Sequence, residues 1–430
     1  MAELQVALDF VDGDRALKLA REAVAGGAAW IEAGTPLIKS EGLDIIRKLR
    51  AEFPRATLIA DLKTMDAGRG EVEIASKAGA DIAHVLGVAS DGTLREAIEA
   101  GRNVGLKIAV DMINVADPAA RAGQVAEWGA HHAVLHIGID QQMAGETPFE
   151  TLAQIARRVE IPLAVAGGLN SETVVDAIEA GAEIVIVGGA ITKSPDARKA
   201  TEEILEAIRT GARKESALYK RTSADRVREV FSQVSTANLS DGAHRMPCMS
   251  GIRPLAPGLK VVGRAVTVRT YPGDWSKPVQ AIDAAQPGEV IVIDAAGSGP
   301  AVWGELATHS CIQQKVAGVV VDGAIRDTAD IREMRFPAFS RLVLSNAGEP
   351  RGFGEINVPV TVGGVHVEPG DWIVGDDDGV MVVPKARAAE MANYAMDCLE
   401  RENRIRDEID RGQTTLGKVV DLLRWDKKGH

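Results

Sequence analysis

Three charged residues follow an apolar run in the stretch Leu58-Ile-Ala-Asp-Leu-Lys-Thr-Met-Asp66. Residues two apart on a strand point to the same side, so Asp61 and Lys63 would share a face at a strand end, with Asp66 on the loop beyond it. Charges at the end of a buried strand are costly unless they pair or hold a metal ion. The motif therefore predicts either a salt-bridged strand end or part of a catalytic site.

Eight short apolar runs recur through the first half of the chain at intervals of roughly 20–30 residues, which is the spacing of βαβ units. Helical patterns lie between the runs, and several end in a glycine-containing turn that is typical of helix C-caps. The count of eight, with paired glycines at the last two strand ends, favours a (β/α)8 TIM barrel over an open doubly wound sheet. The predicted strands are Leu4–Phe10, Ala29–Gly34, Leu58–Lys63, Ile82–Val88, Leu106–Ile113, Ala133–Gly138, Pro162–Gly168 and Glu183–Gly189.

The carboxyl ends of the strands carry the chemistry in such barrels, and here those ends are rich in ionisable residues. Of the first six strands, only the fourth ends without one, and a purely structural barrel would not need so many charges on one rim. His131 and His132 begin the sixth strand, on the opposite rim, and are interpreted as structural. The residues at the carboxyl ends are Asp9, Glu32, Asp61 with Lys63, Asp111, His136, Gly167-Gly168 and Gly188-Gly189.

These groups suggest distinct roles. Glu32 and Asp61 close adjacent strands and could share one hard cation such as Mg²⁺. His136 stands where a proton donor or acceptor could act. A single Gly-Gly pair would usually be a tight turn, but two pairs on the final strands predict a phosphate site, because glycine lets backbone N–H groups approach an anion.

The composition bounds the remaining possibilities. A chain of 430 residues with 46% hydrophobic content predicts two domains with sizeable cores. The net charge of -12 argues against a nucleic-acid-binding surface, and no apolar run approaches the roughly 20 residues that span a membrane. Cys248, Cys311 and Cys398 lack metal-ligand or redox spacing, which predicts reduced thiols in a cytoplasmic protein.

The second half follows a different pattern. Residues 1–211 are predicted as the barrel, residues 212–222 as a linker, and residues 223–430 as a mixed α/β domain with a C-terminal helical tail. Within it, Gly304-Glu305-Leu306-Ala307 opens a helix after a Gly/Ser-rich loop, where free amides could bind a carboxylate. Arg326 and Asp327 follow a buried strand and suit a carboxylate and a hard metal, although an isolated Arg-Asp pair is mostly a surface ion pair.

The barrel half resembles 3-hexulose-6-phosphate synthase, in the orotidine-monophosphate-decarboxylase-like group of barrels. The motifs that carry the resemblance are Ala7-Leu-Asp9, Ile31-Glu-Ala-Gly-Thr35-Pro36, Ala60-Asp-Leu-Lys-Thr-Met-Asp66, Val110-Asp-Met-Ile113 and the two Gly-Gly ends. The resemblance implies an aldol condensation of formaldehyde with D-ribulose 5-phosphate to 3-hexulose 6-phosphate, or its reverse. It implies Mg²⁺, with Mn²⁺ as an alternative, on Glu32 and Asp61, and a dimer in which Asp66 reaches into the partner's site. The implied catalytic residues are Asp9, Lys63, Asp66, Asp111 and His136, and the implied substrate-binding residues are Thr35, Gly167, Gly168, Gly188 and Gly189. Lys63 would stabilise the developing oxyanion, and we expect its pairing with Asp9, Asp61 and Asp66 to keep it charged.

The 3-keto-gulonate-6-phosphate decarboxylases share most of these motifs and are the alternative. They carry a basic residue three positions after the rim histidine, where this chain has Ile139. An arginine there would help to hold or protonate a charged intermediate, whereas isoleucine cannot. This difference, together with Ala144-Gly145, favours the synthase.

The second half resembles the RraA-like family, a swivelling-domain group that includes class II 4-hydroxy-4-methyl-2-oxoglutarate aldolases, oxaloacetate decarboxylases and a regulator of ribonuclease activity. Trp303-Gly-Glu-Leu, Val321-Asp-Gly-Ala-Ile-Arg-Asp327 and Gly375-Asp-Asp-Asp-Gly379 carry the resemblance. It implies that Gly304–Ala307 and catalytic Arg326 bind a pyruvate-like 2-oxo acid, that Asp327 holds Mg²⁺ or Mn²⁺, and that the chain forms trimers. With barrel dimers, the homo-oligomer could be a hexamer. The alternative is a non-catalytic binding module of the ribonuclease-regulator type.

Overall fold

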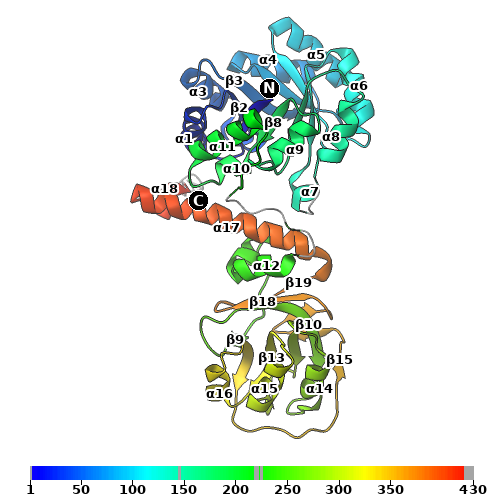
Figure 1. Ribbon diagram of the computed structural model, residues 1–430, viewed down its shortest axis with the longest axis vertical. Helices are drawn as coiled ribbons and strands as arrows, with labels where there is room; N and C mark the ends of the chain where they lie inside the picture. The colour runs from blue at the N-terminus through cyan, green and yellow to red at the C-terminus, as the bar shows by residue number, and fades with distance from the viewer. Residues whose placement is uncertain (1, 144–146, 217–221, 223–225, 421–430) are drawn as a thin grey trace, which may run out of the picture. The chain divides into compact units, whose positions relative to one another are not determined.

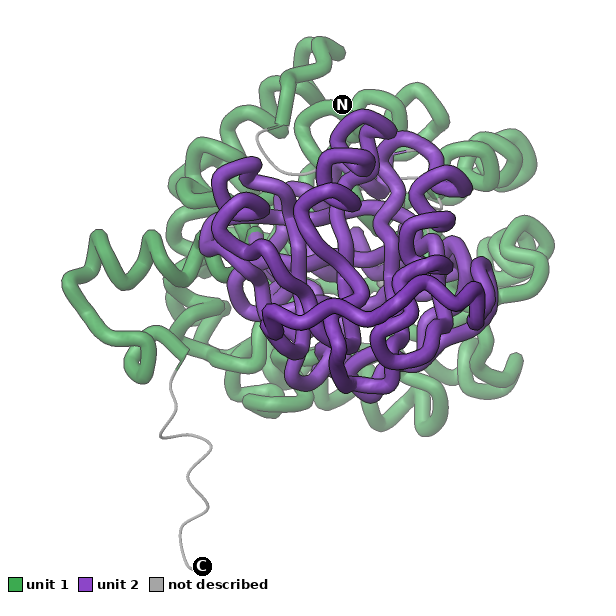
Figure 2. Tube along the Cα trace, turned by 90° about the horizontal axis from the view of Figure 1, so that it is seen from below, with its two compact units in different colours: residues 1–221, 400–430 green, residues 222–399 purple. Residues whose placement is uncertain are grey.

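The computed structural model describes residues 2–143, 147–216, 222 and 226–420. The chain forms two compact units, which are residues 1–221 with 400–430, and residues 222–399 (Figure 2). Residues 217–221 of the predicted linker and the Ala144-Gly145 pair lie outside the described residues.

The first unit is the predicted (β/α)8 barrel, in which eight strands close in chain order (Figure 1). Every neighbouring pair that the pairing describes is parallel, including β1 with β8, which closes the barrel. The strands are β1 (Glu3–Leu8), β2 (Trp30–Ala33), β3 (Thr57–Thr64), β4 (Ile82–Leu86), β5 (Lys107–Asp111), β6 (His132–His136), β7 (Leu163–Ala166) and β8 (Ile184–Val187). The helices are α1 (Gly13–Ala25), α2 (Thr35–Glu41), α3 (Asp44–Glu52), α4 (Gly68–Ala78), α5 (Asp91–Val104), α6 (Pro118–Trp128), α7 (Ile139–Met143), α8 (Phe149–Ala156), α9 (Thr173–Glu179), α10 (Gly189–Thr192) and α11 (Ala197–Thr210).

Local sequence explains where these helices begin and end. The side chains of Asp12 and Ser90 cap α1 and α5 by accepting hydrogen bonds from backbone N–H groups three residues later. Gly79, Gly105 and Gly129 end α4, α5 and α6 with positive φ, a conformation that glycine adopts without a steric cost. The glycine-containing turns predicted from the sequence are therefore helix C-caps.

The barrel interior is a small apolar cluster with polar groups above it. Strand residues two apart face the same side, so the inward set includes Ala7, Ile59, Ile82 and Ala109. A larger core of mainly Leu, Ile, Val and Ala lies between the strands and the helices. Because inward positions alternate, residues two positions beyond the apolar cluster also point into the barrel, toward its carboxyl-end mouth.

The second unit is a mixed α/β domain, as predicted. Its nine-stranded sheet has the order β19-β18-β10-β11-β13-β14-β9, with β12 and β15 pairing at its side. The strands are β9 (Arg253–Pro254), β10 (Val261–Arg269), β11 (Val290–Asp294), β12 (Ala301–Trp303), β13 (Gly318–Ile325), β14 (Ala338–Val343), β15 (Glu355–Ile356), β18 (Trp372–Asp376) and β19 (Gly379–Val383), with β16 (Val360–Val362) and β17 (Val365–Val367) as a separate pair. The helices are α12 (Val227–Gln233), α13 (Thr236–Gly242), α14 (Ser276–Ala284), α15 (Glu305–Gln313) and α16 (Thr328–Glu333).

The long helix α17 (Ala388–Gly412) is shared between the two units, which the sequence did not predict. The sequence assigned residues 223–430 to the second domain, whereas residues 400–430 group with the barrel. The reason is a set of ion pairs with α1, since Arg404 lies 3.4 Å from Glu22 and Glu408 lies 3.4 Å from Arg15. A short helix α18 (Leu416–Val419) follows. Among the described residues, no helix is both long enough and apolar enough to cross a membrane.

Candidate active site

Asp61 and Lys63 form an ion pair at the mouth of the barrel, on the same side of β3 as predicted. The Lys63 ammonium nitrogen Nζ lies 2.9 Å from Asp61 Oδ2 and 2.9 Å from Asp111 Oδ2. Burial by itself would lower the pKa of Lys63, but the two carboxylates outweigh it and hold that pKa above its usual range, so the side chain stays charged. The expectation that Asp9 and Asp66 also pair with Lys63 is wrong, because its ion-pair partners within the described chain are Asp61 and Asp111.

Asp111, at the end of β5, connects Lys63 with His136. Its Oδ2 accepts a hydrogen bond from Lys63 and lies 3.0 Å from His136 Nδ1, while Oδ1 accepts the backbone N–H of Ile113 at 2.9 Å. The carboxyl group is fully buried. Burial would raise the pKa of Asp111, but the contacts with His136 and Lys63 outweigh that effect and lower it. An ionised Asp111 holds the Nδ1 side of His136 and leaves Nε2 for other contacts.

Glu32, Asp61 and His84 form a second cluster inside the barrel. One potential ligand atom from each lies within 4.8 Å of the other two, and all three residues are buried. Burial, reinforced by the charge of Asp61, raises the pKa of Glu32 to about 7. The effect of burial on Asp61 is outweighed by His84 and Lys63, which hold its pKa below the usual range. Two adjacent buried carboxylates fit a divalent cation, because its charge would compensate both.

The surroundings of this cluster fix the two carboxylates in place. Gln5 Nε2 donates a hydrogen bond of 2.5 Å to Glu32 Oε2. The Thr35 hydroxyl, predicted to bind substrate, lies 2.8 Å from Asp61 Oδ2 and therefore also positions that carboxylate. Such outer contacts orient metal ligands in known sites.

His84 and Gln5 were absent from the predicted site. The prediction considered only the last residues of each strand, and His84 is the third residue of β4. Both residues have the inward parity of the apolar cluster, since His84 lies two positions after Ile82 and Gln5 two positions before Ala7. A polar residue at an inward position of a predicted barrel strand is the sequence signal that identifies them.

Asp9 follows β1 and lies at the mouth between two glycines. A Cβ atom at position 34 would lie 2.2 Å from Asp9 Oδ1, so Gly34 is required for this approach. A Cβ at Gly188 would lie 3.5 Å from Asp9 Oδ2, which places the last strand end beside Asp9. By contrast, Asp66 is exposed on the loop after β3, where its carboxylate accepts the N–H of Ala67 at 2.7 Å.

The glycine pairs lie at the ends of β7 and β8, where phosphate binding is predicted. Gly167 and Gly168 have φ values of 116° and 69°, which other residues rarely adopt. A Cβ at Gly167 would also lie 2.8 Å from the carbonyl oxygen of Ile137. Gly188 precedes α10, and the exposed Gly189 is its first residue, where backbone N–H groups lack partners within the helix.

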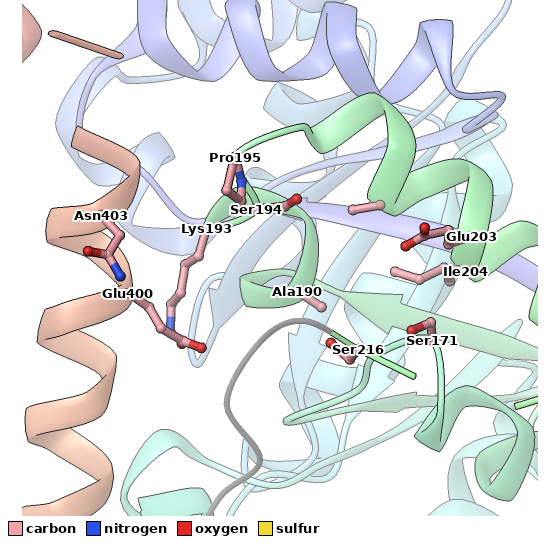
Figure 3. Close-up of a pocket in the computed structure, with 11 residues that line it drawn as sticks. Ser171, Ala190, Lys193, Ser194, Pro195, Glu203, Ile204, Ser216, Glu400 and Asn403 are labelled. Carbon is pink, nitrogen blue, oxygen red and sulfur yellow. The ribbon is translucent and has the colours of Figure 1, made fainter. Parts of the chain in front are cut away.

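A cavity of about 200 Å³ lies beside α10 and α11 (Figure 3). Lys193 extends into it, with its Nζ 3.8 Å from Glu400 Oε2 of α17. A Cβ at Gly189 would lie 3.6 Å from the same Nζ, so this ammonium adds positive charge next to the predicted phosphate-binding turn. The other lining residues are Ser171, Ala190, Ser194, Pro195, Ala200, Glu203, Ile204, Ser216 and Asn403.

The family of the barrel follows from comparison with known proteins. Residues 2–204 match the model described as the orotidine 5'-phosphate decarboxylase / HUMPS family. Proteins named 3-hexulose-6-phosphate synthase from Methylomonas aminofaciens and Bacillus subtilis (strain 168) are 46% and 39% identical to this chain. The matches cover 98% and 100% of those proteins and 47% and 49% of this chain. The chain therefore belongs to the orotidine 5'-phosphate decarboxylase / HUMPS family.

Solved structures are also similar to the first half of the chain. The structure of 3-hexulose-6-phosphate synthase from Salmonella typhimurium covers 49% of this chain and 100% of that chain, at 35% identity and a TM-score of 0.47. The remaining half of this chain lies outside the HUMPS-family barrel and has its own relatives.

The second unit gathers its predicted residues at one exposed corner. Asp327 Oδ2 accepts the backbone N–H of Glu305 at 3.3 Å and lies 3.4 Å from Arg326 Nε. A Cβ at position 304 would lie 2.5 Å from Asp327 Oδ2, so Gly304 is needed for this approach. Leu306 is 74% exposed, and Ala307 is half-buried beside it on α15.

Residues 236–382 match the family model RraA-like, described as aldolase/RraA. The solved structure of Streptomyces coelicolor RraAS2 is similar to this chain, with 30% sequence identity and a TM-score of 0.38. The match covers 44% of this chain and 97% of RraAS2. The chain thus joins a HUMPS-family barrel to an RraA-like domain, as the sequence predicted.

Proposed function

We propose that the barrel catalyses the aldol condensation of formaldehyde with D-ribulose 5-phosphate to 3-hexulose 6-phosphate, or the reverse reaction. The observation that supports it is the joining of two clusters at Asp61. One is the buried carboxylate pair with Glu32, which suits a divalent cation, and the other is the chain of contacts from Lys63 through Asp111 to His136. Aldol chemistry needs both a stabilised enediolate and a positioned proton-transfer group.

The side chains divide the reaction between them. With Nδ1 held by Asp111, His136 offers Nε2 to remove a proton from C1 of the sugar. The resulting enediolate attacks the carbon of formaldehyde, a carbon–carbon bond forms, and the formaldehyde oxygen takes up a proton. Lys63, kept charged by its two carboxylates, stabilises the developing oxyanion.

The remaining groups bind and orient the substrate. Mg²⁺ or Mn²⁺ held by Glu32 and Asp61 would supply Lewis-acid polarisation of the sugar oxygens. The glycine pairs at the ends of β7 and β8 bind the phosphate through backbone N–H groups, with Lys193 nearby. Asp9, beside Gly188 at the mouth of the barrel, would contact a sugar hydroxyl.

The test is formaldehyde consumption by the full-length protein supplied with ribulose 5-phosphate and Mg²⁺. We expect consumption in the wild type and its loss in Asp61→Ala, while Asp327→Ala in the second unit serves as the matched control and retains it. Unchanged consumption in Asp61→Ala would contradict the assignment. Turnover of 3-keto-gulonate 6-phosphate without formaldehyde fixation would instead support the decarboxylase alternative.

We further propose that Asp66 completes the site of a partner barrel in a homo-oligomer. Asp66 is exposed and contacts no other predicted site residue in the described chain, and its neighbour Met65 is 54% exposed. In a mixture of Asp61→Ala and Asp66→Ala subunits, hybrid dimers would carry one intact site, so activity should reappear on mixing. Two variants that stay inactive after subunit exchange would contradict a shared site.

For the RraA-like domain we propose metal-dependent cleavage of a pyruvate-like 2-oxo acid. Arg326 would bind the carboxylate together with the amides at Gly304–Ala307, and Asp327 would hold the cation. A pyruvate-release assay with oxaloacetate, with and without chelator, tests this proposal, with Arg326→Ala as the inactive variant. If no pyruvate is released either with or without chelator, the result would favour the non-catalytic binding module.

A further inference from the structure

The buried imidazole of His84 lies in the cation cluster without a role in the reaction described above. Its relative exposure is 3%, and its Nδ1 lies 3.5 Å from Asp61 Oδ1. This separation is longer than a good hydrogen bond between nitrogen and oxygen. Within the described part of the chain, no hydrogen bond to either ring nitrogen of His84 meets the usual geometric limits.

The strand geometry accounts for its direction. His84 pairs in register with Ala109 of β5, and both have inward parity, as do Glu32 on β2 and Asp61 on β3. Three adjacent strands therefore each place one potential ligand in the same buried cluster. Gln5 and Lys63 already contact the two carboxylates, whereas within the described residues the imidazole has only the 3.5 Å contact with Asp61. A cation bound among the three groups would give its ring nitrogen a close partner.

We propose that His84 is the third protein ligand of the barrel's cation, which makes this a mixed nitrogen and oxygen site that selects a first-row transition ion such as Mn²⁺ or Co²⁺ over Mg²⁺. The proposal rests on the function proposed for the barrel, in which Glu32 and Asp61 hold the cation, and it adds the ligand that determines which cation binds.

Ligand chemistry supports the selection. Mg²⁺ prefers oxygen donors and retains several waters, whereas an imidazole nitrogen suits transition ions. Two ligands at about 2.1 Å from one ion lie about 3.0–3.4 Å apart, depending on whether the angle at the metal is octahedral or tetrahedral. The observed separation of 3.5 Å between His84 Nδ1 and Asp61 Oδ1 is close to this range.

The outer contacts of the cluster are of the kind that supports metal ligands. Gln5 holds Glu32 and the Thr35 hydroxyl holds Asp61, so both carboxylates are oriented before any ion binds. The Lys63 ammonium donates hydrogen bonds to both oxygens of Asp61, at 3.1 and 2.9 Å, and so also orients this carboxylate.

The experiment measures metal binding directly in the full-length protein, and every sample carries Asp327→Ala so that the cation site proposed in the second unit does not contribute. After dialysis against a chelator, the protein is titrated with Mn²⁺ and examined by pulsed electron paramagnetic resonance for hyperfine coupling to a nitrogen nucleus. The variants are His84→Gln and, as the matched control, His132→Gln, which removes another buried imidazole from the barrel interior. Calorimetric titrations with Mn²⁺ and Mg²⁺ give the two affinities.

We expect nitrogen coupling in the wild type and in His132→Gln, and its loss in His84→Gln. Loss of an outer contact already weakens metal binding by roughly 10–100-fold, so His84→Gln should weaken Mn²⁺ binding by at least that factor and Mg²⁺ binding by less. Wild-type protein without nitrogen coupling, a result that needs no variant to fold, would overturn the proposal. Coupling that persists in His84→Gln would also overturn it, because another histidine would then be the ligand.

The readout separates this inference from the proposed function. A protein that binds Mn²⁺ with His84-dependent coupling but consumes no formaldehyde would refute the synthase assignment and leave the ligand assignment intact. A protein that consumes formaldehyde but shows no nitrogen coupling to Mn²⁺ would support the synthase assignment and refute the ligand assignment.

Discussion

The two candidate sites of this chain differ in how the surrounding structure holds their charges. In the barrel, Asp61 and Asp111 are buried and share the ammonium of Lys63, so each charge has a partner within hydrogen-bond distance. In the RraA-like unit, the side chains of Arg326 and Asp327 are 43% and 36% exposed, and their closest approach is 3.4 Å. The charges of the first site are held in a buried network, and those of the second lie on an exposed surface.

This difference indicates how firmly each site holds its charged groups before a ligand binds. A buried network is costly to form and holds its geometry without a ligand, which suits a reaction that needs fixed proton-transfer and cation groups. An exposed pair of charges is weakly held by itself and gains strength only when another surface or a ligand excludes water. The exposed pair of Arg326 and Asp327 is therefore the less pre-organised of the two sites.

The largest expected effect concerns Asp111, because it holds both Lys63 and His136. Asp111→Asn should lower the kcat for formaldehyde fixation by roughly 10²–10⁴-fold, the usual contribution of a positioned proton-transfer group. The matched control is Asp322→Asn in the second unit, since Asp322 is also a buried carboxylate of a strand, within β13, and is paired with Arg341. Equal losses of activity in both variants would remove the distinction between the two regions.

A stability comparison tests how much the buried charge of Lys63 and the exposed charge of Arg326 each contribute to the folded state. Lys63→Met leaves Asp61 and Asp111 buried with one partner fewer, and should lower the free energy of unfolding of the barrel by about 1–3 kcal/mol. Arg326→Met should change the free energy of unfolding of the second unit by less than about 0.5 kcal/mol, because the pair with Asp327 is exposed. Urea denaturation of the metal-free full chain measures both, and a Lys63→Met protein as stable as the wild type would contradict the network.

A pH experiment separates the two ends of the barrel. His132, at the start of β6, packs edge-on against Trp30, and burial lowers its pKa from 6.5 to about 4. Between these values the unfolded chain binds the proton and the folded barrel does not, so stability is complete above pH 6.5 and falls as the pH decreases toward 4. The loss should reach up to about 3 kcal/mol.

The matched variant for this effect is His132→Phe, which keeps the ring but cannot titrate. Its free energy of unfolding should vary less between pH 7 and pH 4.5 than that of the wild type, as measured by urea denaturation at each pH. A wild type and variant with parallel pH profiles would show that His132 is not the group responsible. Formaldehyde fixation at pH 7 should be retained, since His132 lies at the rim opposite the site.

The smallest effect is expected at Asp327, whose φ of 55° places a non-glycine residue in the left-handed region. Asp327→Gly should stabilise the second unit by up to about 1 kcal/mol by removing this strain, while abolishing pyruvate release. Lys63 has a similar φ of 48°, but Lys63→Gly should destabilise the barrel because the buried carboxylates lose their partner. Denaturation midpoints that move in the same direction in both variants would contradict this contrast.

Much of the site in the barrel could be predicted from the sequence because strand parity is strict. Asp61 and Lys63 were expected to share a face, and the interval between strand ends was enough to bring Glu32, Asp111 and His136 to the same rim. The expected pairing of Lys63 with Asp9 and Asp66 was wrong because distances across a barrel mouth depend on strand stagger and on the direction of each side chain. His84 was missed because it lies within its strand and not at its end.

By itself, the sequence determined the eightfold alternation of strands and helices, the family motifs at the strand ends and the existence of a second domain, because these depend on local patterns and spacing. The tertiary structure alone decided that Asp111 bridges Lys63 and His136, that His84 lies beside Glu32 and Asp61 and that the second half of α17 groups with the barrel. These contacts join residues far apart in the chain, and their geometry is set by barrel closure and packing, which no local pattern encodes.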